Sequence, residues 1–70
     1  MNTELLKKDI SESGLKVRSI AERMNISYQA LYNKINGVTE FTVSEIKDYC
    51  RIRGKTVDEL SPIFFSQNVD

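Results

Sequence analysis

The stretch from Lys16 to Gly37 constrains the fold of this chain most, because it predicts two short helices joined by a tight turn. Apolar or small residues recur in it at helical spacing, at Val17, Ile20, Ala21, Met24, Ile26, Leu31 and Ile35. Asn25 accepts the left-handed conformation that a chain reversal needs, and Ser27 offers a hydroxyl to cap a following helix. We therefore expect helices over Val17–Met24 and Tyr28–Ile35 that share one core.

Three more helices complete an all-α prediction. The first covers residues 4–12, after a Thr3 cap, with Leu5, Leu6 and Ile10 on its apolar side. A capping-box pattern at Thr42 and Glu45 opens the next, which runs to Gly54 and carries Val43, Ile46, Tyr49 and Cys50 as its apolar stripe. The same pattern at Thr56 and Glu59 opens a short fifth helix, with Val57 and Leu60 facing inward, which Pro62 breaks or restarts.

Length and composition indicate one small globular domain. The 70 residues contain no linker, repeat or low-complexity segment, so we expect a single domain over residues 1–70, with its core in residues 4–61 and a C-terminal tail at 62–70. No apolar run has the length of a membrane span, and the N-terminus lacks the pattern of a secretory signal. The single cysteine, Cys50, cannot form an internal disulfide. These features favour a cytoplasmic protein with no membrane partner.

Enzymatic chemistry is not expected. The chain has no histidine, so it offers neither the commonest general base nor a Ser/His/Asp or Cys/His arrangement. Its three glycines stand apart, each near an expected helix end, and form no phosphate-binding loop. We therefore expect no cofactor and no metal.

Two helices joined by a tight turn are the layout of a helix-turn-helix, which places its second helix in a DNA major groove. Along the outward side of the expected helix at Tyr28–Ile35, polar and aromatic residues occur one turn apart: Tyr28, Gln29, Tyr32 and Asn33. Gln and Asn bond bidentately to adenine, and a tyrosine edge contacts a thymine methyl group. These four residues are the predicted base contacts; the alternative is that the amides are ordinary solvated residues.

The charge distribution supports a phosphate-binding face on a neutral chain. Ten Lys and Arg balance ten Asp and Glu overall. Residues 16–39, however, contain four cations and one acid, Glu22, which gives this segment a net charge of +3. The predicted phosphate contacts are Lys16, Arg18, Lys34, Asn36 and Thr39.

The segment Ile63-Phe64-Phe65 has two interpretations of about equal weight. Three consecutive large apolar residues cannot all point into the core from one helix, so at least one of them is expected to be exposed or to meet a partner. In one interpretation the three residues contact a second copy or another protein. In the other, the phenylalanines fold back and close the core of a very small domain.

The segments IAERMNIS, YQALYNKI, LYNKING and FTVSEIKDYCRIRG together resemble the Cro/CI-type (XRE-type) helix-turn-helix family of phage and bacterial repressors. The resemblance covers about residues 5–60, and the ending SPIFFSQNVD is similar to that of short prophage members. It implies a five-helix lambda-repressor-like DNA-binding domain that binds a pseudo-palindromic operator as a dimer. It also implies base contacts by Tyr28, Gln29, Tyr32 and Asn33. The chain departs from the family at Lys16-Val17, where many members have a polar residue followed by glutamine.

The sequence therefore predicts a sequence-specific transcriptional regulator, a Cro-like phage repressor in a lysis-lysogeny switch, acting as a homodimer on double-stranded operator DNA in the bacterial cytoplasm. The alternative is a modulator or antirepressor that binds a phage repressor protein through the same fold. Zero net charge, Val17 and the segment at residues 63–65 all motivate this alternative.

Overall fold

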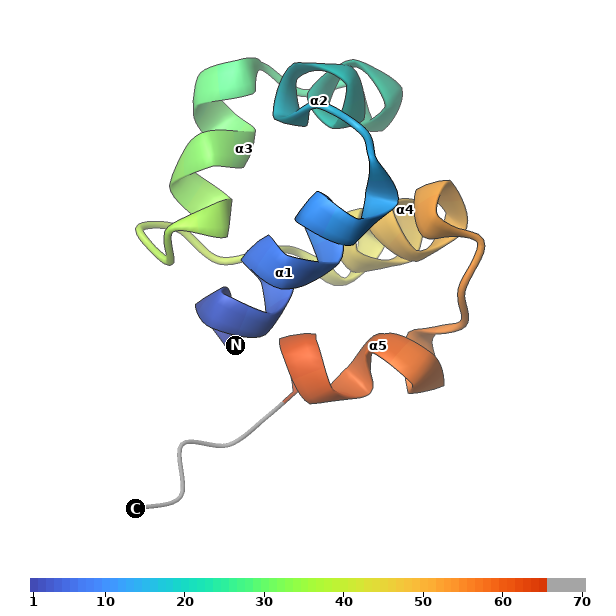
Figure 1. The fold of residues 1–70 in the computed structure, drawn as a ribbon. Helices are drawn as coiled ribbons and strands as arrows, with labels where there is room; N and C mark the ends of the chain where they lie inside the picture. The colour runs from blue at the N-terminus through green and yellow to red at the C-terminus, as the bar shows by residue number, and fades with distance from the viewer. Residues whose placement is uncertain (66–70) are drawn as a thin grey trace.

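Five α-helices make up the protein in a computed structural model that describes residues 1–65 (Figure 1). They are α1 (Thr3–Ser13), α2 (Val17–Met24), α3 (Tyr28–Ile35), α4 (Val43–Arg53) and α5 (Val57–Phe64). No strand occurs in this part of the chain. The all-α prediction is confirmed, and residues 66–70 of the expected C-terminal tail lie outside the described residues.

The helix ends follow the local signals in the sequence. Asn25 adopts φ 59° and ψ 40°, the left-handed conformation expected of it, and Ser27 accepts a hydrogen bond from the backbone N–H of Ala30 at 3.0 Å. Capping boxes open both α4 and α5. The prediction that Thr3 caps the first helix was wrong. Thr3 is already part of α1, and the N-cap is Asn2, whose side chain accepts a hydrogen bond from the backbone N–H of Leu5.

Pro62 does not break α5, which continues through it to Phe64. Proline removes one backbone donor and crowds the carbonyl four residues earlier, a cost that packing of the helix must offset. Leu60, Ile63 and Phe64 are all buried and supply that packing. The core therefore extends to residue 64, and the predicted limit at residue 61 was wrong.

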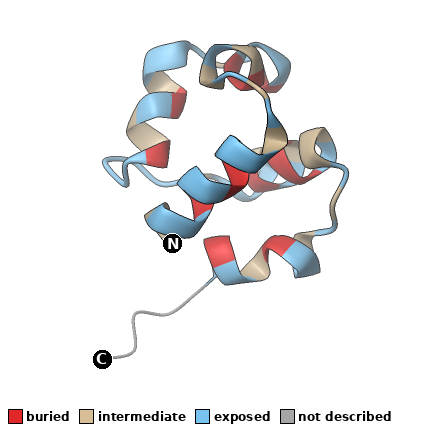
Figure 2. Cartoon of the chain, viewed as in Figure 1, coloured by how far each residue is buried: buried red, intermediate tan, exposed pale blue. Residues whose placement is uncertain are grey.

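The core lies between all five helices, whose buried faces point inward in Figure 2. Most of the apolar residues predicted for α2 and α3 are buried, as are Tyr49 and Cys50 of α4. Val17 and Ile26 are the exceptions, since both are only partly buried against the core. Val43 was expected on that stripe but is 65% exposed, because it is the first residue of α4 and borders an open groove. Leu5 is likewise exposed, at 38%.

A buried carboxylate, Asp9, connects α1 to α4. The Tyr49 hydroxyl donates to it at 2.6 Å, Arg53 donates through Nε at 2.8 Å and through Nη2 at 3.3 Å, and Lys55 Nζ lies 3.5 Å away. Burial alone would raise the pKa of Asp9, but hydrogen bonds from Arg53 and Tyr49 outweigh it and lower that pKa. Burial and the neighbouring Asp9 raise the pKa of Tyr49. The hydrogen bonds and ion pairs of Asp9 were therefore not predicted from the sequence.

The two ends of the helical chain are joined directly. The backbone N–H of Asn2 donates to the carbonyl of Ile63 at 2.7 Å, which ties the start of α1 to the last turn of α5. None of the helices in residues 1–65 is long and apolar enough to cross a membrane.

Candidate nucleic-acid interface

The α2–turn–α3 unit is held together by its buried side. α2 and α3 pack against each other, and Ala21 of α2 and Leu31 of α3, each 1% exposed, are on their buried sides. The turn is fixed by Asn25 and by a hydrogen bond from the N–H of Ile26 to the carbonyl of Ala21 at 3.0 Å. The outward sides of both helices consequently form one surface of the molecule.

The four predicted base-contact residues lie together on the outside of α3. Tyr28 and Tyr32 are 39% and 48% exposed, and their rings stack with centroids 6.0 Å apart and an interplanar angle of 26°. Beside them, Gln29 Nε2 donates to Asn33 Oδ1 at 3.0 Å. This bond leaves Gln29 Oε1 available as an acceptor and the Asn33 amide group available as a donor. The stripe is uncharged and offers both kinds of hydrogen-bonding group.

Arg18 of α2 extends this stripe across the helix pair. Its guanidinium carbon lies 4.9 Å from the centroid of the Tyr28 ring, within the range of a cation–π interaction. The Tyr28 ring therefore contacts both Arg18 of α2 and Tyr32 of α3. Within residues 1–65 the Arg18 guanidinium forms no ion pair, so its N–H groups are available to an acceptor.

The start of α2 is also open to an anion. Lys16 occupies the N-cap position with an extended backbone and makes no side-chain cap hydrogen bond, and its side chain is exposed. The first backbone N–H groups of α2 therefore have no side-chain acceptor from the cap residue. A phosphate at this place would meet a cation and free N–H groups together.

Lys34 is placed differently from the other predicted phosphate contacts. Its Nζ lies 3.0 Å from Glu45 Oε1, donates to the carbonyl of Glu40 at 3.0 Å and sits 6.0 Å from the centroid of the Phe41 ring. Its side chain is only 14% exposed. Lys34 therefore faces the body of the protein rather than the outward stripe.

Asn36 and Thr39 lie at the far end of α3. Asn36 Nδ2 donates to the carbonyl of Tyr32 at 2.9 Å, so its amide closes the helix end while the residue remains exposed. Thr39 is exposed in the loop that follows, and its N–H points to the carbonyl of Asn33 at 3.4 Å. Both residues are accessible, and both are tied to the backbone of α3.

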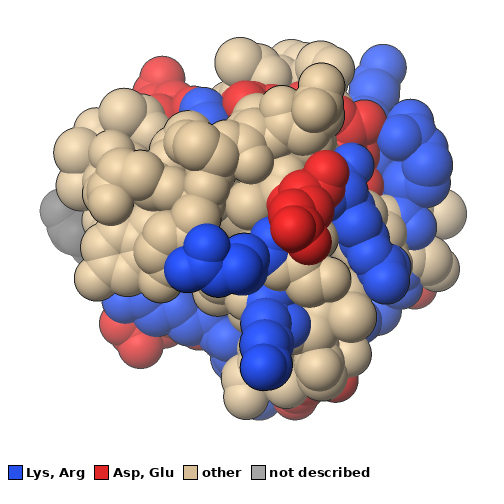
Figure 3. All heavy atoms as spheres, turned by 90° about the horizontal axis from the view of Figure 1, so that it is seen from above, with Lys and Arg blue, Asp and Glu red and all other residues tan. Residues whose placement is uncertain are grey.

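The face over α2 and α3 is mixed in charge (Figure 3). A broad uncharged area lies on the left of this view, with Lys and Arg side chains below it and to its right; acidic side chains lie among the cations near the centre and along the upper edge. Once Lys34 is paired with Glu45, the cations left between residues 16 and 39 are Lys16, Arg18 and Arg23, against the acid Glu22. The face is therefore less basic than the sequence count indicated.

Of the three C-terminal apolar residues, only Phe65 is exposed. Phe64 packs edge-on against Phe41 and Tyr49, with centroid distances of 5.3 and 5.8 Å, and Ile63 is 6% exposed. The expectation of a partner contact at Ile63 and Phe64 is corrected in this respect: both side chains belong to the core, because the helix continues through Pro62 and turns them inward. Phe65, at 54% exposure, remains on the surface.

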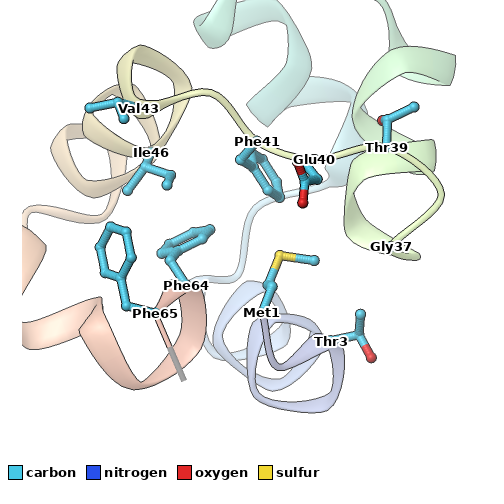
Figure 4. A pocket seen from close by; sticks show the side chains of 10 residues that line it. All are labelled: Met1, Thr3, Gly37, Thr39, Glu40, Phe41, Val43, Ile46, Phe64 and Phe65. Carbon is cyan, nitrogen blue, oxygen red and sulfur yellow. The ribbon is translucent and has the colours of Figure 1, made fainter. Parts of the chain in front are cut away.

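Phe65 borders a groove of about 370 Å³ between the loop after α3 and the ends of α4, α5 and α1 (Figure 4). Its lining is mixed, with polar and apolar surface in similar amounts, and Phe41, Phe64 and Met1 point toward one another across it. Thr39 and Glu40 form its rim on the loop side. This groove is separate from the stripe on α3.

No protein-family model matches the chain, and neither the curated proteins nor the solved structures contain a match to it.

Proposed function

We propose that this protein is a sequence-specific DNA-binding transcriptional regulator, a Cro-like phage repressor of lambda-repressor-like architecture in which α2 and α3 are the helix-turn-helix. The observation that carries the proposal is the uncharged stripe on the outer side of α3, where exposed Gln29 and half-exposed Asn33 lie beside Tyr28 and Tyr32. If the two amides were buried, a role in stabilising the fold would explain them. Two hydrogen-bonded amides on an outward face are instead suited to reading base edges.

The contacts on α3 favour adenine-thymine pairs in the major groove. Adenine presents its N6 amino group as a donor and N7 as an acceptor, which matches one amide oxygen and one amide N–H. Gln29 retains both groups when its other N–H is bonded to Asn33. The adjacent Tyr28 and Tyr32 edges supply apolar contact for a thymine methyl group.

Binding by two copies compensates for the weak charge of one. Phosphate neutralisation supplies a large share of protein–DNA affinity, and within residues 16–39 one copy offers Lys16, Arg18 and Arg23 once Lys34 is paired with Glu45. A dimer on a pseudo-palindromic operator doubles these contacts. Occupying the operator would exclude polymerase or a rival repressor, in the cytoplasm of a bacterial host.

Fluorescence titration tests the proposal. The protein is added to labelled duplex DNA from upstream of its own operon, at several salt concentrations, with a scrambled duplex of equal length as the control. The expected result is tighter binding to the upstream duplex, with affinity that falls as salt rises. Absence of salt-dependent binding at micromolar protein would contradict the proposal.

A second candidate function is modulation of a phage repressor by direct protein contact. Phe65 favours it, because a large apolar side chain that is 54% exposed at the edge of a groove containing other aromatic side chains is typical of a protein-binding surface. Co-purification with a repressor encoded nearby, lost in Phe65→Ser but retained in Arg18→Gln, would favour this function over DNA binding.

A further inference from the structure

Two cations of the α2–α3 unit, Arg18 and Lys34, differ sharply in their surroundings. Arg18 is exposed and stacks on the Tyr28 ring, with no carboxylate among its contacts within residues 1–65. Lys34 is largely covered and bonded to Glu45 and to the carbonyl of Glu40. The two residues carry the same charge, so a count from the sequence treats them alike.

The Lys34 contacts connect two helices at one corner. Lys34 is in the last turn of α3, and Glu45 is in the first turn of α4, where its carboxylate also accepts from the N–H of Thr42 at 2.8 Å. Burial would raise the pKa of Glu45, but the Thr42 and Lys34 hydrogen bonds outweigh it and lower that pKa. The carboxylate is thus ionised at neutral pH and joined to both helices.

We infer that Lys34 is a positioning residue that braces the end of α3 against the start of α4, while Arg18 supplies the phosphate contact. The inference rests on the proposed DNA-binding function and assigns different roles to two cations of the same surface. A Lys34 ammonium that moved to a phosphate would leave Glu45, whose side chain is 18% exposed, without its cation. Arg18 gives up no ion pair when it meets a phosphate.

The chain offers well-matched variants for the test. Glu45→Gln removes the charge but preserves the capping box, because glutamine also fills this position. Lys34→Met removes the ammonium but keeps an unbranched apolar stem beside Phe41. Arg18→Gln removes the other cation, and Arg18→Lys keeps its charge without the planar stack.

Salt-dependent DNA binding separates bracing from phosphate contact. Arg18→Gln is expected to reduce the slope of log affinity against log salt by about 1, and Arg18→Lys is expected to preserve the slope. Lys34→Met and Glu45→Gln are expected to weaken binding by a similar factor, about three to ten, with the slope unchanged. The double variant Lys34→Met/Glu45→Gln should bind no more weakly than either single variant. If Lys34→Met reduced the slope as Arg18→Gln does, or if Glu45→Gln tightened binding, the brace would be refuted while DNA binding stood.

Thermal unfolding of the free protein tests the brace without DNA. Glu45→Gln should lower the midpoint by about 4 °C in the wild-type background and have little effect in the Lys34→Met background. Equal shifts in both backgrounds would show that the two residues are not coupled and would overturn the inference. Failure of the wild type to bind DNA would instead overturn the proposed function, and with it the assigned role of Arg18, while the unfolding cycle would still report on the ion pair.

Discussion

At the scale of single residues, the polar contacts divide into those that hold the fold and those that face outward. Asp9 belongs to the first kind, since it is 6% exposed and bonded to Tyr49 and Arg53. Gln29 and Asn33 belong to the second kind, since their side chains bond only to each other among the described residues. Substitutions at the two places are therefore expected to affect different measurements.

Replacing Asp9 by Asn is expected to lower the free energy of unfolding by about 2–3 kcal/mol, because it leaves the covered Arg53 guanidinium without its counter-charge. Urea unfolding followed by circular dichroism measures this change. Tyr49→Phe is the milder control, with an expected loss of about 1 kcal/mol from one hydrogen bond. If Asp9→Asn left the free energy of unfolding unchanged, the cluster around Asp9 would not stabilise the fold.

The same carboxylate predicts how stability depends on pH. The pKa of Asp9 is lowered in the folded protein from its usual value of 3.8, so its contribution is fully present above pH 3.8 and is lost as the pH falls below that value through the folded pKa. Unfolding midpoints measured from pH 6 to pH 2 should show this loss in the wild type and a smaller loss in Asp9→Asn. Parallel curves for the two proteins would contradict the assignment.

Replacing Gln29 or Asn33 by Ala is expected to relax base preference by about 1–3 kcal/mol each, with little change in the unfolding midpoint. The measurement is titration against operators that carry single base-pair changes. Since Asn33 orients Gln29, the two effects should be less than additive in the double variant. Unchanged specificity in both single variants would remove these residues from the proposed base contacts.

The outward stripe was predictable from the sequence, whereas its contacts with α2 and α4 were not. Helical spacing alone puts residues 28, 29, 32 and 33 on one side, because neighbours three or four apart share a face. The stack of Arg18 on Tyr28 and the pairing of Lys34 with Glu45 depend on how separate helices pack. The contacts of Asp9 join residues 40 and 44 positions apart, which no local pattern encodes.

At the scale of helices, most boundaries were predictable because the residues that end a helix act locally. Asn25, Thr42 and Thr56 carry the conformations and hydrogen bonds that their types favour. The predicted helix break at Pro62 was wrong, because the cost of a proline in a helix is local whereas the burial that offsets it comes from packing against other helices. The same dependence on packing decided which of Phe64 and Phe65 became buried.

The turn between α2 and α3 gives a test at this scale. Asn25→Ala is expected to lower the free energy of unfolding by about 1 kcal/mol, because alanine tolerates the left-handed conformation less well than asparagine. Asn25→Gly should be neutral within a few tenths of a kcal/mol, since glycine adopts that conformation freely. Thermal unfolding of the two variants side by side measures the difference, and equal midpoints would show that the backbone of this turn is unconstrained.

At the scale of the whole molecule, net charge and binding geometry are linked. A chain with ten cations and ten acids gains little from long-range attraction to DNA, so its proposed affinity depends on local contacts made twice. We expect the slope of log affinity against log salt to be about twice as steep for a two-half-site operator as for a single half-site. Titration of the two duplexes at matched protein concentration measures this. Equal slopes would contradict dimeric binding.

The hydrogen bond between Asn2 and Ile63 also has a kinetic consequence. It joins two residues near opposite ends of the described part of the chain. If it formed early in folding, the conformational entropy lost in closing such a long loop would not yet be offset by other contacts. The contacts between α2 and α3 close a much shorter loop and therefore cost less conformational entropy. Folding is therefore expected to begin at the turn around Asn25 and to finish when α5 docks on α1, and the seam between the two chain ends is where unfolding should start.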